Sequence, residues 1–343
     1  MFSFLGFTGI LSPMVVRQSG GLRPSDEGGH FAPSLLYTAS KLYYEEDATQ
    51  AEIAVKLHTS RATVSRLLSE ARRQGIVRIE VIAPGHDGSA DLAARVSAAL
   101  GLHAVHISGA LPASTAGKPV EDVMGSVLAP AVSRALAAVG LVRGDILLVS
   151  SGRTMYEVAQ FDLPNLPGVV VAPTVGGTDQ PEGWYQTNEI TRRVAERIGG
   201  RPTYLFAPAL PGPELFRTLQ RDPAIQRVLH LWPSARCVLT GVGAPPMLRS
   251  QAPQFVDVGA PELLEAVGDV CSRFFSRTGR VVAFPGAERL IAVDLATLRR
   301  IPTVIAVAAG RDKVPPIIAG ARAHYFNQLV TDPRTAEEIL ARA

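Results

Sequence analysis

The segment at residues 50–68, QAEIAVKLHTSRATVSRLL, decides how the N-terminal part of this chain folds. Its apolar residues recur at i, i+3 and i+4, which predicts two short helices that cross at a tight turn. A small side chain is needed where the helices cross, and Ala54 stands there. The inward positions are Ile53, Ala54, Leu57, Val64, Leu67 and Leu68. This pattern is typical of a helix-turn-helix.

The ends of both helices carry capping residues. Thr49 and Glu52 predict a capping box that starts the first helix, and Ser60 is placed to cap the second. His58 stands at the turn position that glycine usually occupies. Histidine tolerates a left-handed backbone better than most residues do, so the turn is weakened but allowed.

The outward face of the second helix is polar and basic. Arginine and short hydroxyl side chains on this face suit the major groove of DNA. Residues 60–74 hold four arginines against one glutamate, so phosphates are expected there. The candidate DNA contacts are Thr59, Ser60, Arg61, Thr63, Ser65 and Arg66. An amphipathic helical hairpin with a solvated basic face is the competing interpretation.

The flanking sequence favours DNA binding over that alternative. Residues 35–44 predict a preceding amphipathic helix, and Gly75 predicts a helix stop. The alternating residues at 76–82 then predict a β wing. The order of helix, helix, recognition helix and wing is that of a winged helix-turn-helix, so we expect double-stranded operator DNA as a partner.

Composition limits what the rest of the chain can be. The 343 residues are 47% apolar and 19% charged, which is too much chain for one small core and predicts two domains. A formal net charge of +3 excludes a general polyanion binder. Cys237 and Cys271 lack metal-ligand spacing and the dense pattern of a disulfide scaffold. We therefore expect a cytoplasmic protein without a metal or cofactor.

Residues 1–33 are expected to be an N-terminal extension. Residues 1–16 are apolar but lack a basic start and the length of a membrane span, and residues 20–29 are polar and rich in glycine. We expect a disordered segment, or an over-extended start with Met14 as the initiator. A signal peptide is the alternative, and no membrane partner is expected.

The remaining sequence predicts an α/β fold. Residues 34–82 would form the winged helix-turn-helix, 83–89 a linker, and 90–343 a ligand-binding and oligomerisation domain. Short apolar strands that alternate with helices indicate a doubly wound, mainly parallel sheet, which binds ligands beyond the strand carboxyl ends. The predicted strands are 104–108, 145–150, 168–174, 203–208, 236–241, 280–284, 303–307 and 325–330. The predicted helices include 121–139, 154–160, 186–198 and 335–343.

Three glycine turns at predicted strand ends indicate a ligand site. In SSGRT at 150–154, the residues Gly152, Arg153 and Thr154 would begin a helix, where free N–H groups attract anions, although most such turns are only caps. PTVGG at 173–177 ends the next strand, and GRDK at 310–313 ends another with a cation. Lys313 is one of only four lysines; alone it would be a solvated residue, but beside these turns it is placed to reach a phosphate.

The helix-turn-helix and the strand-end motifs together resemble the SorC/DeoR-type sugar-responsive transcriptional regulators of bacteria. The motifs, in order, are SRATVSRLL at 60–68, EARRQGIV at 70–77, SSGRT at 150–154, PTVGG at 173–177, GVG at 241–243, GDVCSRFF at 268–275, GRDK at 310–313 and LVTD at 329–332. The resemblance implies a domain related in fold to sugar-phosphate isomerases and glucosamine-phosphate deaminases, with a phosphorylated sugar as effector. It also implies homo-dimers or homo-tetramers.

The resemblance assigns site residues. It places Gly152, Arg153 and Thr154 on the phosphate, Lys313 near a phosphate or sugar oxygen, and Asp269 on hydroxyls. The double glycine at 176–177 ends a predicted strand, and Gln186 and Asn188 open the helix that follows, at the same edge of the sheet. With them, the complete set of expected effector contacts is Gly152, Arg153, Thr154, Gly176, Gly177, Gln186, Asn188, Asp269 and Lys313. Met155 stands where family members often have a second hydroxyl, and Val175 where some have a cation. The identity of the sugar and a second phosphate are therefore left open.

An enzyme is the rival hypothesis. A sugar-phosphate isomerase or deaminase that carries a DNA-binding arm would need a base beside the substrate carbonyl, backed by a second acid or histidine. Strand ends supply Asp269 and Asp179, but no carboxylate and histidine stand at a recognisable spacing. We therefore expect a regulator and no catalytic residues. The operator, and whether the effector releases or strengthens DNA binding, are not predicted.

Overall fold

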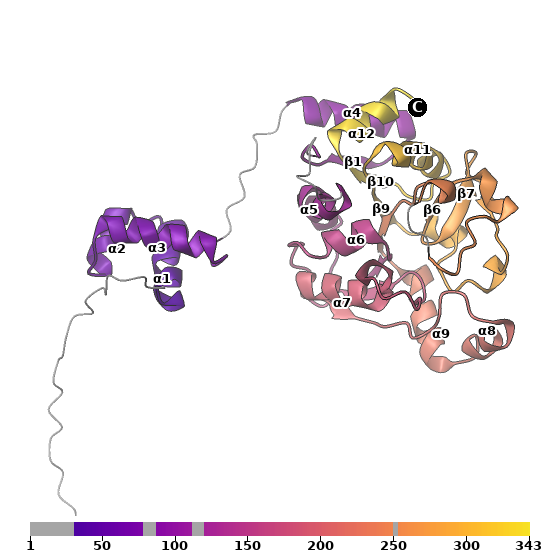
Figure 1. Ribbon diagram of the computed structural model, residues 1–343, viewed down its shortest axis with the longest axis horizontal. Helices are drawn as coiled ribbons and strands as arrows, with labels where there is room; N and C mark the ends of the chain where they lie inside the picture. The colour runs from indigo at the N-terminus through magenta and orange to yellow at the C-terminus, as the bar shows by residue number, and fades with distance from the viewer. Residues whose placement is uncertain (1–30, 78–86, 112–119, 250–252) are drawn as a thin grey trace, which may run out of the picture. The chain divides into compact units, whose positions relative to one another are not determined.

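The computed structural model describes residues 31–77, 87–111, 120–249 and 253–343. The chain divides into two compact units, Met1–Ala83 and Pro84–Ala343. Each unit is described by itself (Figure 1). The predicted extension at 1–33 lies outside the described residues up to residue 30, and most of the predicted wing, from residue 78, also lies outside them.

The N-terminal unit contains three helices, α1 (Pro33–Tyr44), α2 (Gln50–Lys56) and α3 (Arg61–Arg73). Both α1 and α2 pack against α3. The apolar positions predicted to face inward are buried in one cluster, except Leu57, which is partly buried against it. The predicted helix-turn-helix is confirmed.

The predicted caps of these helices are present. The Thr49 hydroxyl accepts the Glu52 N–H at 3.3 Å while the Glu52 carboxylate accepts the Thr49 N–H at 2.8 Å, which completes the capping box. The Ser60 hydroxyl accepts the Thr63 N–H at 3.0 Å. His58 has a φ of 48°, the left-handed conformation expected at the turn between α2 and α3.

The C-terminal unit is built on a parallel sheet of seven strands in the order β1-β10-β9-β5-β2-β3-β4. Successive residues of a strand pack into different apolar clusters, as Leu147 and Leu148 of β2 do. The strands are therefore buried on both faces, which is why they read as continuous apolar runs. Their bounds are β1 Ala104–Ile107, β2 Ile146–Val149, β3 Val170–Pro173, β4 Arg201–Pro202, β5 Cys237–Gly241, β9 Thr303–Val307 and β10 Gln328–Thr331.

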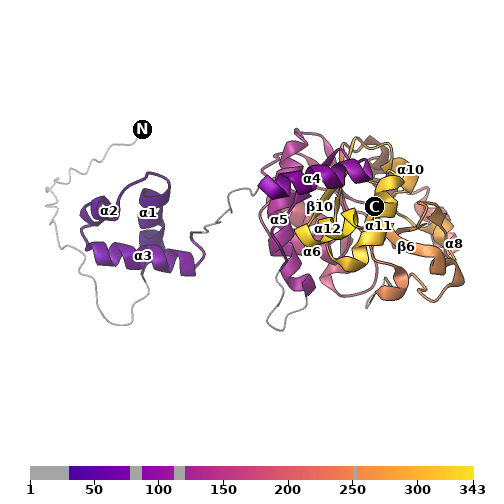
Figure 2. The ribbon, with the colours of Figure 1, turned by 90° about the horizontal axis from the view of Figure 1, so that it is seen from above.

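Helices cover both faces of this sheet, as the predicted doubly wound fold requires. One face carries α4 (Asp87–Leu100), α10 (Leu295–Leu298), α11 (Val314–Arg322) and α12 (Pro333–Leu340), whose apolar residues share a cluster. In two perpendicular views α4, α11 and α12 lie side by side (Figures 1 and 2). The other face carries α5 (Val120–Ala138), α6 (Arg153–Val158) and α7 (Thr187–Ile198).

A second, antiparallel sheet contains β6 (Ala266–Val270), β7 (Arg273–Ser276) and β8 (Val281–Val282). Strands β6 and β7 were not among the predicted strands, and the predicted strand 280–284 was wrongly placed in the parallel sheet, because β8 pairs with β7 in this second sheet. Helices α8 (Pro213–Leu219) and α9 (Pro223–Leu229) lie in the long connection between β4 and β5. Within the described ranges, no helix combines the length and the apolar character needed to cross a bilayer.

Two further expectations differ from the structure. The strand expected at 203–208 is absent, because the Asn188 side chain takes both backbone groups of Leu205, its N–H at 3.0 Å and its carbonyl at 3.2 Å. The parallel pairing of this edge instead ends at Pro202. Helix α4 begins at Asp87, so the last residues of the expected linker, 87–89, are helical.

Candidate functional site

A cavity of about 390 Å³ opens at the carboxyl ends of the central strands. Strand β5 lies between β2 and β9, and the chain leaves β2 towards β3 but leaves β9 towards β10, in opposite directions. This reversal is the position where parallel α/β sheets bind ligands. The turns after β2, β5 and β9 line the cavity, together with the tip of the β6–β7 hairpin.

Two glycine turns on either side of β5 have nearly the same backbone conformation. Gly152 has φ 115° and ψ 157°, and Gly310 has φ 110° and ψ 152°. These angles are essentially restricted to glycine, so the turns explain why glycine stands at both positions. Each turn leads directly into a helical segment that brings its first side chains to the cavity, Arg153 and Thr154 in one case and Lys313 in the other.

The cavity lining carries more positive than negative side chains. Arg153, Arg249, Arg311 and Lys313 line it beside the acidic side chains of Asp269 and Asp312. Burial raises the pKa of the Cys271 thiol, which also lines the cavity, to about 11, so the thiol stays neutral. A cationic, partly enclosed cavity favours an anionic ligand.

Aromatic side chains hold Arg153 at the wall of the cavity. Its guanidinium carbon lies 4.5 Å from the centre of the Trp184 ring, a cation–π geometry. The Trp184 ring makes an edge-to-face contact with Tyr156. The backbone carbonyl of Trp184 accepts the Gly152 N–H at 2.9 Å. The Gly152 turn, Arg153 and the Trp184 segment thus form one packed unit.

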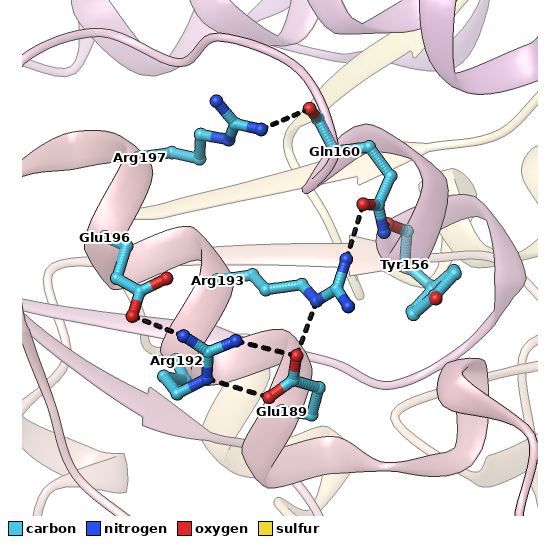
Figure 3. Close-up of polar contacts among 7 residues, drawn as sticks. All are labelled: Tyr156, Gln160, Glu189, Arg192, Arg193, Glu196 and Arg197. Carbon is cyan, nitrogen blue, oxygen red and sulfur yellow. Dashed lines mark hydrogen bonds and ion pairs between the residues drawn. The ribbon is translucent and has the colours of Figure 1, made fainter.

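A polar network anchors α6, the short helix that begins at the Gly152 turn, to α7 (Figure 3). Arg193 lies over the Tyr156 ring at 5.2 Å and donates to the side chains of Gln160 and, at 2.6 Å, Glu189. Arg197 donates to the Gln160 carbonyl at 2.6 Å. Tyr156 lies on α6 and Gln160 directly after its end, whereas Arg193 and Arg197 lie on α7, so these contacts tie α6 to α7.

The same network predicts an acid-dependent loss of stability. Hydrogen bonds from Arg192, joined by one from Arg193, lower the pKa of Glu189 to about 2. A carboxylate whose folded pKa lies below its ordinary 4.5 adds stability above pH 4.5 and loses it as the pH falls towards 2. Urea unfolding of Glu189→Gln should therefore show a shallower decline of unfolding free energy over that window than the natural chain. Equal slopes would contradict the network's role.

Asp269 is committed to an ion pair. Its carboxylate contacts the Arg249 guanidinium and accepts the Ser272 N–H at 3.0 Å, and the two side chains are only 13% and 14% exposed. Arg249 also donates to the Ala244 carbonyl at 2.8 Å. A sugar hydroxyl at Asp269 would therefore meet a carboxylate and guanidinium pair rather than a lone carboxylate.

Gly243 makes room for this pair, which gives a stability prediction. A Cβ there would overlap both the Asp269 carboxylate and the Arg249 guanidinium. We expect Gly243→Ala to lower the free energy of unfolding by about 1–3 kcal/mol, the usual cost of overpacking. Gly241→Ala is the matched control, since a Cβ at that nearby glycine meets nothing within 4 Å. Equal denaturant midpoints for the two variants would refute the steric argument.

The structure brings together only part of the predicted effector set. Gly152, Arg153, Thr154, Asp269 and Lys313 line one cavity. The other four predicted residues, Gly176, Gly177, Gln186 and Asn188, lie outside its lining.

These four residues have structural partners instead. A Cβ at Gly176 would lie 2.6 Å from the Ala207 carbonyl oxygen, so close chain packing explains the first glycine. The Gly177 N–H donates to that carbonyl at 2.8 Å. The Gln186 side chain donates to the Gln180 carbonyl, and Asn188 holds the backbone of Leu205. The structure thus corrects their expected place in the pocket.

Sequence reasoning missed several residues that line the cavity. They are Ser151, Trp184, Arg249, Ser272 and Arg311, among others. Arg249 gave no signal because arginine is the common cation in this chain, and its distance in sequence from Asp269 hides their pairing. Trp184 is one of only two tryptophans in the chain, and this rarity is the sequence signal that could have marked it as a site residue. Among the described residues, no group of His, Cys, Asp and Glu is arranged to hold a metal ion.

The second candidate site is the outward face of α3. Arg61, Ser65 and Arg66 are exposed there, as predicted. The Thr63 hydroxyl instead lies 2.9 Å from that of Ser60, so both hydroxyls serve the helix start, and Thr59 is half-buried. Arg73 pairs with Glu70 at 2.9 Å within the helix. Arg61 and Arg66 are therefore the stronger candidates for phosphates and bases.

Comparison with known proteins assigns both parts of the chain. A family model described as "Putative sugar-binding domain" matches residues 86–341, and one described as "Sigma-70, region 4" matches residues 41–74. The deoxyribonucleoside regulator of Bacillus subtilis is 32% identical over 89% of this chain and 97% of the relative. The sorbitol operon regulator of Klebsiella pneumoniae is 31% identical over the same shares.

The solved structures agree with the sequence relatives. The crystal structure of the full-length sorbitol operon regulator SorC from Klebsiella pneumoniae matches with a TM-score of 0.74 and 28% identity, covering 91% of this chain and 100% of that one. A helix-turn-helix joined to a sugar-binding α/β domain defines a class of DNA-binding regulator. The chain belongs to the SorC/DeoR-type family of sugar-binding transcriptional regulators. These relatives are named as regulators, which supports the regulator hypothesis over the isomerase or deaminase hypothesis.

Proposed function

We propose that the cavity binds a phosphorylated sugar and that this ligand changes the affinity of the protein for operator DNA. The observation that carries the proposal is the pair of glycine turns, at Gly152 and Gly310, which bring Arg153, Thr154 and Lys313 to one cavity. Backbone N–H groups of a first helical turn have no acceptor within the helix, so they add to these donors. Such a set matches a phosphate dianion.

The other lining residues support a sugar as the remainder of the ligand. A volume of about 390 Å³ is at the small end of ligand pockets and suits a monosaccharide phosphate. Asp269 and Arg249 offer an acceptor and donors for hydroxyls on the side of the cavity formed by the β6–β7 hairpin. The Thr154 hydroxyl lies 3.8 Å from the Met124 sulfur, a weak acceptor that a phosphate oxygen would replace.

The N-terminal unit supports the DNA-binding half of the proposal. Residues 34–82 would hold the operator through α3, and residues 90–343 would bind the effector. Relatives that match nearly the whole chain are named as regulators of a sorbitol operon and of deoxyribonucleosides, which favours a sugar-derived effector. A regulator of this kind works in the cytoplasm, where operator DNA is accessible.

We further propose that the protein is a homo-dimer or homo-tetramer. One helix-turn-helix reads only a few base pairs, and paired half-sites raise specificity. Light scattering of the full chain should give a mass of at least two copies of the 36.4 kDa protein. A monomer at micromolar concentration would contradict this part of the proposal.

Ligand binding tests the proposal directly. The Trp232→Phe variant leaves Trp184, a lining residue, as the only tryptophan, so its fluorescence should report occupancy of the cavity. We expect saturable quenching by one of a panel of pentose and hexose phosphates, and a much weaker response to the unphosphorylated sugars. Thermal unfolding should agree, because a ligand at 100 times its Kd adds about 2.7 kcal/mol. A response to no sugar phosphate, or equal affinity for sugar and sugar phosphate, would overturn the proposal.

A further inference from the structure

The LVTD motif at 329–332 has no role in the site described above, yet its last residue is a buried carboxylate. Asp332 follows β10, is only 2% exposed, and is the N-cap of α12. Its carboxylate accepts the Thr335 N–H at 3.3 Å and also the Thr335 hydroxyl. A buried carboxylate needs such donors, because an unpaired charge in the interior is costly.

The Thr335 hydroxyl connects this cap to the cavity. Its oxygen accepts the Gly310 N–H at 2.8 Å, and Thr335 is itself buried. Because a carboxylate can only accept, the hydroxyl must donate to Asp332, which leaves its lone pairs for Gly310. The hydrogen bonds therefore run in one direction, from Gly310 through Thr335 to Asp332.

The Gly310 turn depends on such support. Glycine adopts a φ of 110° readily, but it adopts other conformations as readily, so the residue alone does not hold the turn in this shape. The turn brings Arg311, Asp312 and Lys313 to the cavity. A hydrogen bond to the turn's own N–H fixes the peptide plane at its start. It also keeps that N–H directed at Thr335, so the turn presents its side chains to the ligand rather than this backbone group.

We propose that Asp332 and Thr335 are positioning residues for the effector pocket, which hold the Gly310 turn and, through it, Lys313 in the anion-binding conformation. The proposal rests on the proposed function, because it presumes that the cavity binds an anion. Neither residue lines the cavity, so they act through the turn and not on the ligand.

The alternative is that Asp332 and Thr335 serve only to cap α12, and the chain contains a control for this. Asp294 and Thr297 form the same cap on α10, with the Asp294 carboxylate accepting the Thr297 N–H at 2.7 Å and its hydroxyl at 2.8 Å. Thr297 is also buried and lies outside the cavity lining. Each threonine hydroxyl accepts one further donor, the Arg300 guanidinium at 3.4 Å for Thr297 and the N–H of a pocket turn for Thr335. The caps differ also in burial, since Asp294 is exposed and Asp332 is buried.

The test compares Thr335→Val, Thr335→Ser and Thr297→Val in the full chain. Binding of inorganic phosphate and of ribose 5-phosphate is measured by calorimetry, and thermal unfolding is measured for each variant. Both valine variants should lose thermal stability, since each loses the hydroxyl that donates to the capping carboxylate, and Thr335→Val should lose more because the Gly310 N–H also loses its acceptor. Thr335→Val should also bind the anions roughly three- to tenfold more weakly, the loss expected for one hydrogen bond, while Thr335→Ser and Thr297→Val keep natural affinity.

Hydrogen exchange gives a readout that capping alone would not move. The Gly310 amide should exchange faster in Thr335→Val and at the natural rate in Thr297→Val. Natural anion affinity and natural Gly310 exchange in a folded Thr335→Val would overturn the proposal. If Thr335→Val does not fold, Asp332→Asn replaces it, with weaker anion binding expected and unchanged binding contradicting the proposal. Absence of anion binding in the natural chain would instead count against the proposed function.

Discussion

Operator binding should weaken by roughly 5- to 150-fold when Arg66 is replaced by alanine, and further when Arg61 is replaced as well. The range corresponds to about 1–3 kcal/mol for an arginine that reads a base edge. Both side chains are exposed on the outward face of α3, whereas the core of the unit lies on its other face. A duplex selected from a random pool by the natural protein supplies the operator, and fluorescence anisotropy measures its Kd at fixed salt concentration.

The matched control for this prediction is Arg73→Ala. Arg73 is an exposed arginine of the same helix, but it pairs with Glu70. Its removal should change the operator Kd much less. Effector affinity should be unchanged in all three variants, because the cavity is lined by the other compact unit. Natural operator affinity in the Arg61 and Arg66 double variant would refute the assignment of α3 as the recognition helix.

Effector binding should weaken by one to two orders of magnitude in Lys313→Ala and likewise in Thr154→Ala. Each variant would lose a hydrogen bond to a charged phosphate, worth about 1.5–3 kcal/mol. Calorimetry with the sugar phosphate that binds most tightly measures the change. Operator affinity without ligand should stay natural, since neither residue belongs to the N-terminal unit. The response of DNA binding to ligand should fall in proportion to lost occupancy.

Lys56→Ala is the control for loss of a lysine charge, because Lys56 lies on α2 in the other unit. Its effector affinity should equal that of the natural chain. An intact ligand response in Lys313→Ala would place the GRDK turn outside the phosphate site. The family assignment would stand in that case, and the assignment of the phosphate to the Gly310 side of the cavity would fall.

The helix-turn-helix could be predicted closely because its determinants are local. The capping box at Thr49 and Glu52, the N-cap at Ser60 and the left-handed turn at His58 all depend on residues within a few positions of one another. Thr63 was the exception, since the same local chemistry that caps α3 turns its hydroxyl towards Ser60. A short hydroxyl residue at the start of a helix looks the same in the sequence whether it caps the helix or contacts DNA.

Residues of the pocket could be predicted from the sequence only where a recognisable motif, such as a glycine turn, stands at the end of a strand. The turns at Gly152 and Gly310 follow directly from buried strands, and both line the cavity. The double glycine at 176–177 carried the same signal for a different reason, which is the close approach of the chain at Ala207. Arg249 could not be found because its partner Asp269 is brought to it by the antiparallel hairpin, a long-range pairing without a local pattern.

The misassigned strands share one physical cause. Residues 203–208 have the composition of a strand, but at Leu205, in their middle, both backbone groups bond to the side chain of Asn188 instead of a neighbouring strand. Residues 280–284 do contain strand β8, but its partner is β7, in the second sheet. Propensity identifies segments that could be extended, and the tertiary partner decides whether and where they pair.

The central claim is that a sugar phosphate in the cavity and operator DNA on α3 affect each other's binding. The most direct test is to measure operator Kd with and without saturating sugar phosphate, and sugar phosphate Kd with and without saturating operator. Linkage requires the two ratios to be equal, and typical couplings give about 5- to 150-fold. We expect equal ratios that differ from one in the natural chain. A sugar phosphate that binds the cavity tightly and leaves operator affinity unchanged, with a ratio of one in both directions, would contradict the claim.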